Sequence, residues 1–165
     1  MPEYFVELPW PQLTNADHLI NRVDENPNHL YNQNGYENYS QAVNLKDWPT
    51  LEDDVKYILE ELPIDYSIAK HVSVQRVLPP GLPMHIDRNR SVAAIALITD
   101  NTAWTVFQEP GEKIQRIKFE SSKWYMFNGL IPHCVKGLKE LRVALCIDLS
   151  QTFNDYRSAK NELLR

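Results

Sequence analysis

The segment Met84-His85-Ile86-Asp87-Arg88-Asn89-Arg90 lies between a proline-rich turn and the most apolar run of the chain. A single residue separates His85 from Asp87. In an extended strand, residues two apart point to the same side, so this imidazole and this carboxylate can converge on one point. Such a pair can hold a metal, orient a proton or form a simple hydrogen bond. The rest of the sequence has to decide among these.

The sequence around this pair predicts a mainly β fold. Residues 91–99 are rich in Ala, Val, Ile and Leu and predict a buried strand. Further short strands, with turn residues between them, are predicted at 71–78, 104–107, 113–119, 124–127, 134–135 and 141–149. Such a run of short strands is typical of an antiparallel sandwich, jelly roll or barrel. The last strand alternates Arg142, Ala144 and Cys146 with Val143, Leu145 and Ile147.

Helices and loops are expected to flank this β core, which spans about residues 67–150. Residues 1–66 are expected to support it, with a strand at 4–8 and a helix opening within 14–20. Residues 24–41 have neither a period of 2 nor one of 3.6, and predict a loop. A helix with Thr50 as cap should follow and end at Pro63. A C-terminal helix is expected over residues 152–165.

Composition limits the classes of protein to consider. The 165 residues fit one domain with 43% apolar residues, and the net charge is −5 without a basic tract. General nucleic-acid binding is therefore not expected. No apolar run approaches the length of a membrane span, and no secretory signal is visible at the N-terminus. Two cysteines, Cys134 and Cys146, do not make a disulfide framework, so a reduced cytoplasmic protein is expected.

Two later residues can extend the chemistry of His85 and Asp87. His133 follows Pro132 at the start of a predicted strand, and Arg142 lies nine residues further inside an apolar strand. A guanidinium in a core strand is costly unless it meets an anion. Arg142 can form a structural ion pair with Glu140 or Asp148, or receive the carboxylate of a ligand inside the barrel.

Taken together, His85-x-Asp87…His133…Arg142 resembles the motif of the iron(II)- and 2-oxoglutarate-dependent oxygenases. The resemblance covers about residues 71–149, and it includes the turn at 78–81 and the second-histidine strand at 132–135. It implies a double-stranded β-helix, a jelly-roll, cupin-like barrel. It also implies that His85, Asp87 and His133 bind Fe(II), a facial triad that leaves metal positions open. Arg142 would pair with the distal carboxylate of 2-oxoglutarate.

The chain departs from the family's pattern at one position beside the expected cosubstrate site. Many members have Ser or Thr two residues after the arginine, where this chain has Ala144. Gln75 and, as a weaker candidate, Tyr125 can supply the missing partner, although both can equally be plain barrel lining. Arg88 and Arg90 can bind an acidic group of the substrate or the cosubstrate, or be solvated strand-edge charges.

The activity implied is oxygenation with O2 and 2-oxoglutarate, releasing succinate and CO2. The short length resembles small hydroxylases of the aspartyl/asparaginyl and prolyl type, so the expected substrate is an amino-acid side chain, free or in a peptide or protein. One alternative is a cupin-like barrel that binds a metal or a carboxylate without oxygenase turnover. Another is a purely structural barrel in which His85, Asp87 and His133 never meet.

Overall fold

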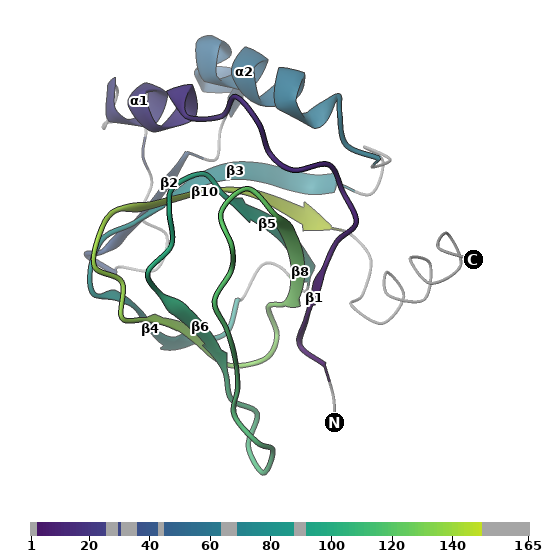
Figure 1. The fold of residues 1–165 in the computed structure, drawn as a ribbon. Coiled ribbons are helices and arrows are strands. Elements are labelled where there is room, and N and C mark those ends of the chain that lie inside the picture. The colour runs from purple at the N-terminus through teal and green to yellow at the C-terminus, as the bar shows by residue number, and fades with distance from the viewer. Residues whose placement is uncertain are drawn as a thin grey trace.

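The computed structural model describes residues 3–25, 30, 36–42, 45–63, 69–87 and 92–149. This part of the chain forms ten strands, two α-helices and one short 3-10 helix (Figure 1). In chain order they are β1 (Phe5–Glu7), α1 (His18–Glu25), β2 (Tyr39–Ala42), η2 (Leu45–Asp47), α2 (Pro49–Leu59), β3 (Ala69–Val77), β4 (Gly81–His85), β5 (Val92–Leu97), β6 (Trp104–Phe107), β7 (Gln115–Ile117), β8 (Trp124–Asn128), β9 (His133–Lys136) and β10 (Arg142–Leu149).

The strands form two antiparallel sheets with the nested pairing of a jelly roll. The six-stranded sheet has the order β1-β8-β5-β10-β3-β2, and the four-stranded sheet has the order β4-β9-β6-β7. The innermost pair is β6 with β7, followed outward by β5 with β8, β4 with β9, and β3 with β10. Successive pairs alternate between the sheets, as expected when one long antiparallel ribbon winds into a barrel. The predicted jelly roll is therefore confirmed.

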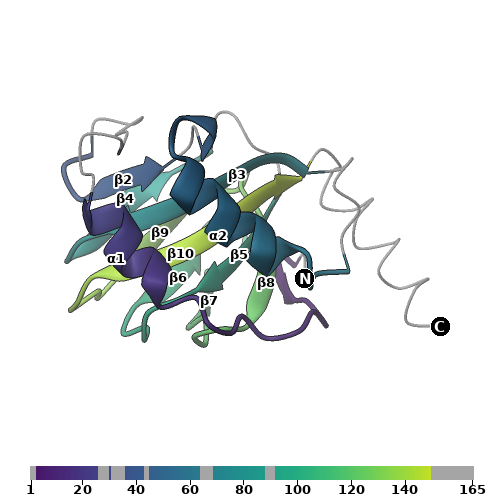
Figure 2. The same ribbon diagram turned by 90° about the horizontal axis from the view of Figure 1, so that it is seen from above.

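Both helices lie on the outer face of the six-stranded sheet (Figures 1 and 2). Leu51, Val55, Ile58 and Leu59 repeat at helical spacing, so α2 has one apolar face. That face packs into a buried cluster with Val143 and the other outward residues of β10. Fully burying such a side chain contributes roughly 1.5–3 kcal/mol to the stability of the fold, so this contact stabilises both the helix and the sheet.

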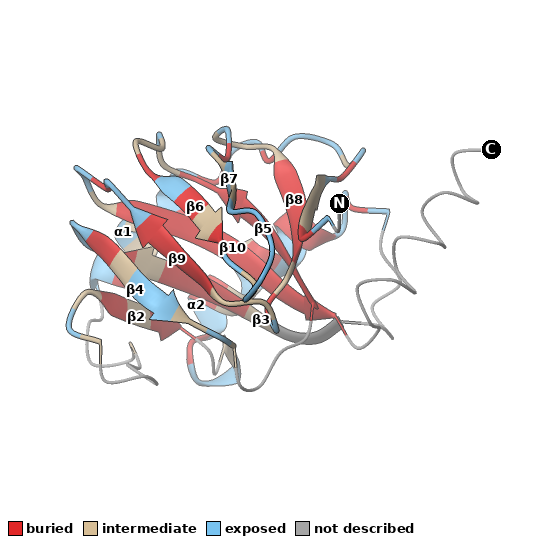
Figure 3. Cartoon of the chain, turned by 90° about the horizontal axis from the view of Figure 1, so that it is seen from below, coloured by how far each residue is buried: buried red, intermediate tan, exposed pale blue. Residues whose placement is uncertain are grey.

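The second layer of the core lies between the two sheets. Ala144 and Cys146 of β10 join a buried cluster with Phe107 of β6, whereas Val143, Leu145 and Ile147 join the helix-side cluster. The predicted alternation along the last strand is therefore confirmed, and it places the side containing Arg142 toward the barrel interior. Seen from the opposite side in Figure 3, exposed residues of β4 and β6 lie in front of buried strands.

The local prediction for the second helix needs correction. Helix α1 begins at His18, inside the segment 14–20 in which the sequence predicts a helix to open, and Asn15, with a left-handed φ of 54°, lies before it. Helix α2 begins at Pro49, so Thr50 lies inside the helix and Trp48 precedes it without a side-chain cap. Proline suits this first helical position because the amide that it lacks has no helical partner there.

The predicted loop at 24–41 is only partly a loop. Residues Tyr39–Ala42 form β2, which pairs antiparallel with β3 and closes one edge of the six-stranded sheet. A four-residue strand carries too little period-2 signal to be seen, and its pairing with β3 stabilises it. The predicted C-terminal helix at 152–165 lies outside the described residues.

Candidate metal centre

Strand pairing brings the predicted ligands together from distant parts of the sequence. His85 at the end of β4 is paired in register with His133 at the start of β9, and their ring centroids are 4.4 Å apart. The jelly-roll nesting of β4 with β9 creates this neighbourhood, although 47 residues separate the two histidines in sequence. The alternative of a structural barrel in which these residues never meet is therefore wrong.

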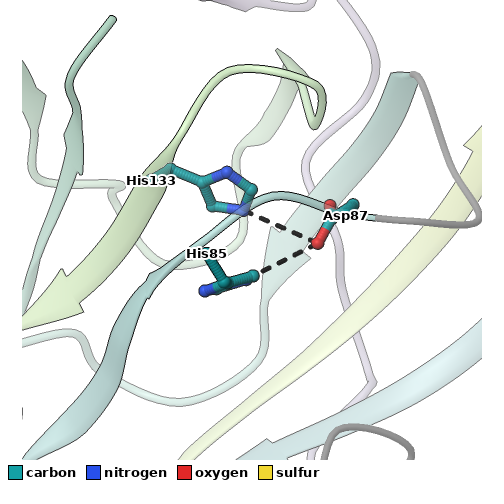
Figure 4. A group of neighbouring side chains, drawn as sticks. All are labelled: His85, Asp87 and His133. Carbon is teal, nitrogen blue, oxygen red and sulfur yellow. Dashed lines mark ion pairs between the residues drawn. The ribbon is translucent and has the colours of Figure 1, made fainter. Parts of the chain in front are cut away.

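Asp87 completes the group from the segment that follows β4. Its Oδ1 lies 3.5 Å from Nε2 of His85 and 3.7 Å from Nε2 of His133 (Figure 4). The backbone amide of Asp87 donates to the carbonyl oxygen of Gly129 at 2.8 Å, which fixes the carboxylate beside the turn leading into β9. One ligand atom from each of the three residues lies within 4.8 Å of the others.

Both histidine rings are held by the same local contact. The Nδ1 atom of His85 lies 2.8 Å from the carbonyl oxygen of Pro83, and that of His133 lies 2.8 Å from the carbonyl oxygen of Ile131. A carbonyl oxygen only accepts, so each Nδ1 is the donor, and in the neutral imidazole the lone pair that a metal can use is then on Nε2. Metal-binding histidines are usually oriented in this way by a backbone or carboxylate partner.

The donor set fits a divalent first-row metal with open positions. Two imidazole nitrogens and one carboxylate form the facial triad of non-haem iron sites, and no cysteine is among the ligand atoms of this group. With metal–ligand bonds of about 2.1 Å, two donors of one ion can be up to about 4.2 Å apart, and the His–Asp distances of 3.5 and 3.7 Å are within that reach. The side chains of His85, Asp87 and His133 are 12%, 14% and 7% exposed, so the centre lies just below the surface.

Aromatic rings surround the histidines on the protein side. Phe107 and Phe127 lie 5.7 and 5.5 Å from the ring of His133, and Tyr36 lies 5.9 Å from that of His85. The centre therefore lies against an apolar interior.

Arg142 is the buried charge that the sequence singled out. It is 5% exposed, and burial lowers the pKa of its guanidinium to about 10. Its Nε and Nη1 atoms have no hydrogen-bond partner within the described part of the chain, and no ion pair joins it to Glu140 or Asp148 there. A buried guanidinium without an anion is costly, so its surroundings favour an anionic ligand.

Other predicted site residues have varied surroundings. Gln75 is buried and directly opposite Ala144, on the interior side of β3. The hydroxyl of Tyr125 accepts a hydrogen bond from the amide of Glu120 at 3.1 Å, and burial raises its pKa. Its ring also stacks on that of Phe119, with 4.5 Å between centroids. Arg88 and Arg90 lie outside the described residues.

Sequence reasoning missed two interior hydroxyls. The Oγ1 atom of Thr105 and the Oγ atom of Ser73 are buried, and neither has a hydrogen-bond partner among the described residues. Both lie on strands whose alternate residues face the barrel interior. The alternation of residues 104–107 places Thr105 on the same side as Phe107. The sequence could therefore have indicated that Thr105 faces the interior.

Neither helix in the described ranges has the length and apolarity that crossing a membrane requires. Both cysteines are free and buried. Cys134 lies next to His133 in sequence, and burial raises the pKa of its thiol.

Comparison with known proteins identifies the fold and no more. No protein-family model matches the chain, and no curated protein matches its sequence. Among solved structures, a 2OG-Fe(II) oxygenase family oxidoreductase from Burkholderia pseudomallei aligns with a TM-score of 0.55 at 12% identity, covering 90% of this chain and 85% of that one. OsALKBH1 aligns with a TM-score of 0.54 at 10% identity, covering 90% of this chain and 99% of that one.

A third likeness covers part of a larger protein. The Escherichia coli ribosomal oxygenase YcfD aligns with a TM-score of 0.50 at 17% identity, covering 78% of this chain and 36% of that one. The chain therefore has a 2-oxoglutarate-oxygenase-like, jelly-roll fold. The predicted fold class is confirmed at this level.

Proposed function

We propose that this protein is an Fe(II)- and 2-oxoglutarate-dependent dioxygenase that hydroxylates an amino-acid side chain, free or in a peptide or protein. The observation that carries the proposal is the buried Arg142, whose guanidinium faces the interior of the same barrel that holds the His85, Asp87 and His133 cluster. A metal cluster and a buried cation in one barrel suit a ligand that chelates at one end and carries a carboxylate at the other.

In this proposal each residue has a separate task. His85, Asp87 and His133 hold Fe(II), with both histidines presenting Nε2 because their Nδ1 atoms face backbone carbonyls. Arg142 binds the distal carboxylate of 2-oxoglutarate. Bound iron supplies the activation of O2 that couples hydroxylation to conversion of 2-oxoglutarate into succinate and CO2.

The interior of the barrel also fits this chemistry. Phe107 and Phe127 pack against the ring of His133 and exclude water from that side of the centre. Arg88 and Arg90 are proposed to contact an acidic group of the substrate, and Gln75 and Tyr125 to line the cosubstrate pocket. A reducing, cytoplasmic setting agrees with two free cysteines.

The test is 2-oxoglutarate turnover by purified protein supplied with Fe(II) and O2. Slow succinate formation is expected without substrate, and faster formation with an amino-acid or peptide substrate from a screening panel. His133→Ala should abolish both, while His18→Ala, a histidine that pairs with Asp54 away from the centre, should not. Metal binding by the wild-type protein with no succinate under any condition would reject the oxygenase and favour the cupin-like binding barrel.

A further inference from the structure

The outer face of the four-stranded sheet differs from that of the six-stranded sheet. Helices α1 and α2 lie over the six-stranded sheet, and none of the described helices lies over β4, β9, β6 and β7 (Figures 1 and 3). Two large apolar side chains of these strands reach solvent, since Trp104 is 40% exposed and Met84 is 42% exposed. Aromatic residues and Met are enriched where proteins bind one another, so this face has features of an interaction surface.

Strand register gathers three cationic side chains around Trp104. Trp104 of β6 is paired with Lys136 of β9, and Val106 of β6 is paired with Arg116 of β7. Directly paired residues, and alternate residues of one strand, point to the same side of a sheet. The guanidinium carbon of Arg116 lies 5.0 Å from the centroid of the Trp104 ring, and Nζ of Lys118 lies 5.7 Å from it. Both are cation–π contacts. Trp104, Arg116, Lys118 and Lys136 form the basic face.

The three cations of the basic face are not neutralised within the described part of the chain. Arg116, Lys118 and Lys136 are exposed, and no ion pair joins them to a described residue. Other surface cations each pair with a carboxylate, namely Arg22, Lys56, Arg76 and Lys123. The whole chain has a net charge of −5, so the basic face opposes the overall balance. Such a local excess of positive charge attracts an anionic partner.

Acidic side chains near the basic face are absent from its strands or engaged elsewhere. Strands β4, β6, β7 and β9 contain no Asp or Glu. Glu109, after β6, accepts the hydrogen bond of Tyr4, and Glu120, after β7, pairs with Lys123. The carboxylates that the three cations lack therefore have to come from another molecule.

The position of β7 favours an extended polypeptide as that molecule. β7 is at the edge of the four-stranded sheet, and an edge strand has backbone groups that can pair with an added strand. Basic side chains on an edge repel a second copy of the same edge, but they attract an acidic strand. A nucleic acid has no peptide backbone to pair with β7, and a base that stacked on Trp104 would compete with Arg116 and Lys118 for the ring. In an extended peptide, alternate side chains share one side about 7 Å apart, as Arg116 and Lys118 do.

We propose that the basic face binds an acidic segment of a partner polypeptide, which adds to β7 in extended form. Alternate Asp or Glu side chains of that segment pair with Arg116 and Lys118. Trp104 aligns the two cations and offers apolar contact, and Lys136 extends the positive charge to β9. The interaction needs neither metal nor 2-oxoglutarate, so it stands apart from the proposed oxygenase activity.

The test is an NMR titration of isotope-labelled protein with a peptide in which Glu and Ser alternate. The amide signals of β6, β7 and β9 and the indole N–H signal of Trp104 are expected to shift and to saturate. The double variant Arg116→Gln/Lys118→Gln should weaken binding by about 5- to 30-fold, as expected for the loss of two exposed ion pairs. Trp104→Ala should weaken it by about two- to fivefold, because the ring no longer aligns the cations.

Matched controls separate the basic face from general charge attraction. Lys46→Gln/Lys56→Gln removes the same charge from η2 and α2, and should change the affinity by less than about twofold. A peptide of alternating Gln and Ser should not bind. The charge-reversed variant Arg116→Glu/Lys118→Glu should lose the Glu–Ser peptide and gain binding of a Lys–Ser peptide.

Three results would overturn the proposal. One is the absence of saturable shifts in β6, β7 and β9 with the Glu–Ser peptide. Another is an equal loss of affinity in Lys46→Gln/Lys56→Gln. The third is tighter binding of a single-stranded oligothymidylate of the same charge at the same signals, which would make the partner a nucleic acid.

Discussion

His85 and His133 lie opposite each other on β4 and β9, and each is turned by the carbonyl oxygen two residues before it. These contacts, from Pro83 and Ile131, are both 2.8 Å long. They leave both Nε2 atoms within 3.7 Å of one oxygen of Asp87. The barrel therefore presents three ligand atoms in a prearranged group, and metal binding needs little reordering of the side chains.

Metal binding should stabilise the wild-type protein and not the triad variants. A ligand that binds only the folded state at 100 times its dissociation constant adds about 2.7 kcal/mol to the free energy of unfolding. We expect Mn(II) or Co(II) to raise the melting temperature of the wild-type protein. His133→Ala should lose this increase, whereas His18→Ala should keep it. An equal increase in His133→Ala would show that the metal binds elsewhere.

Arg142 is expected to lower the stability of the ligand-free protein. Burial lowers the pKa of its guanidinium to about 10, which means that the folded state disfavours the charge. Arg142→Met should raise the free energy of unfolding by about 1–4 kcal/mol in urea titrations without ligand, because an apolar side chain replaces an unpaired charge. The same variant should lose 2-oxoglutarate binding. A destabilised Arg142→Met with normal binding would indicate a structural role.

Gly81 should be essential for the start of β4, which delivers His85. Its φ is +123°, and an added Cβ would overlap the carbonyl oxygen of Val135 on the paired strand. Gly81→Ala is therefore expected to lower the free energy of unfolding by more than about 3 kcal/mol. Gly111→Ala is the matched control, since its φ is +82° but no atom lies within 4 Å of the added Cβ. It should cost only about 1 kcal/mol, for the backbone conformation alone. Equal costs in denaturant titrations would contradict the steric argument.

Tyr4 should make stability fall at alkaline pH. Its hydroxyl donates to Oε2 of Glu109 at 2.6 Å, and this bond, with burial and nearby acidic charge, raises the pKa of Tyr4 to about 12. The unfolded chain loses this proton near pH 10, so stability contributed below that pH is lost between about pH 10 and 12. Tyr4→Phe should flatten this decline in thermal melts. Tyr57→Phe, which alters a side chain 66% exposed, should leave it unchanged; a decline identical in Tyr4→Phe would rule out the linkage.

Much of the barrel and its metal cluster could be predicted from sequence because period 2 is a strong signal in long strands. Residues 142–149 alternate cleanly, and the two faces of β10 pack as that alternation requires. The sequence could also indicate that His85 and Asp87 converge, because residues two positions apart point to the same side of an extended chain. The pairing of His85 with His133 required the resemblance to a known motif, since no local pattern links residues so far apart.

What the sequence could not reveal depends on contacts between distant strands. Strand β2 is four residues long and is stabilised by pairing with β3, which local propensity does not report. Thr105 stands out only because its hydroxyl is buried without a described partner, a property of packing rather than of pattern. Helix α2 begins at Pro49 and has no side-chain cap, although the sequence favoured Thr50 as its cap.

The most direct test of the account is anaerobic addition of Fe(II) and then 2-oxoglutarate to the purified protein, followed by visible absorption. The account predicts a weak charge-transfer band that appears only when both are present, that is lost in His133→Ala, and that needs far more 2-oxoglutarate in Arg142→Met. A well-folded wild-type protein that binds Fe(II) and shows no such band at any 2-oxoglutarate concentration would contradict it.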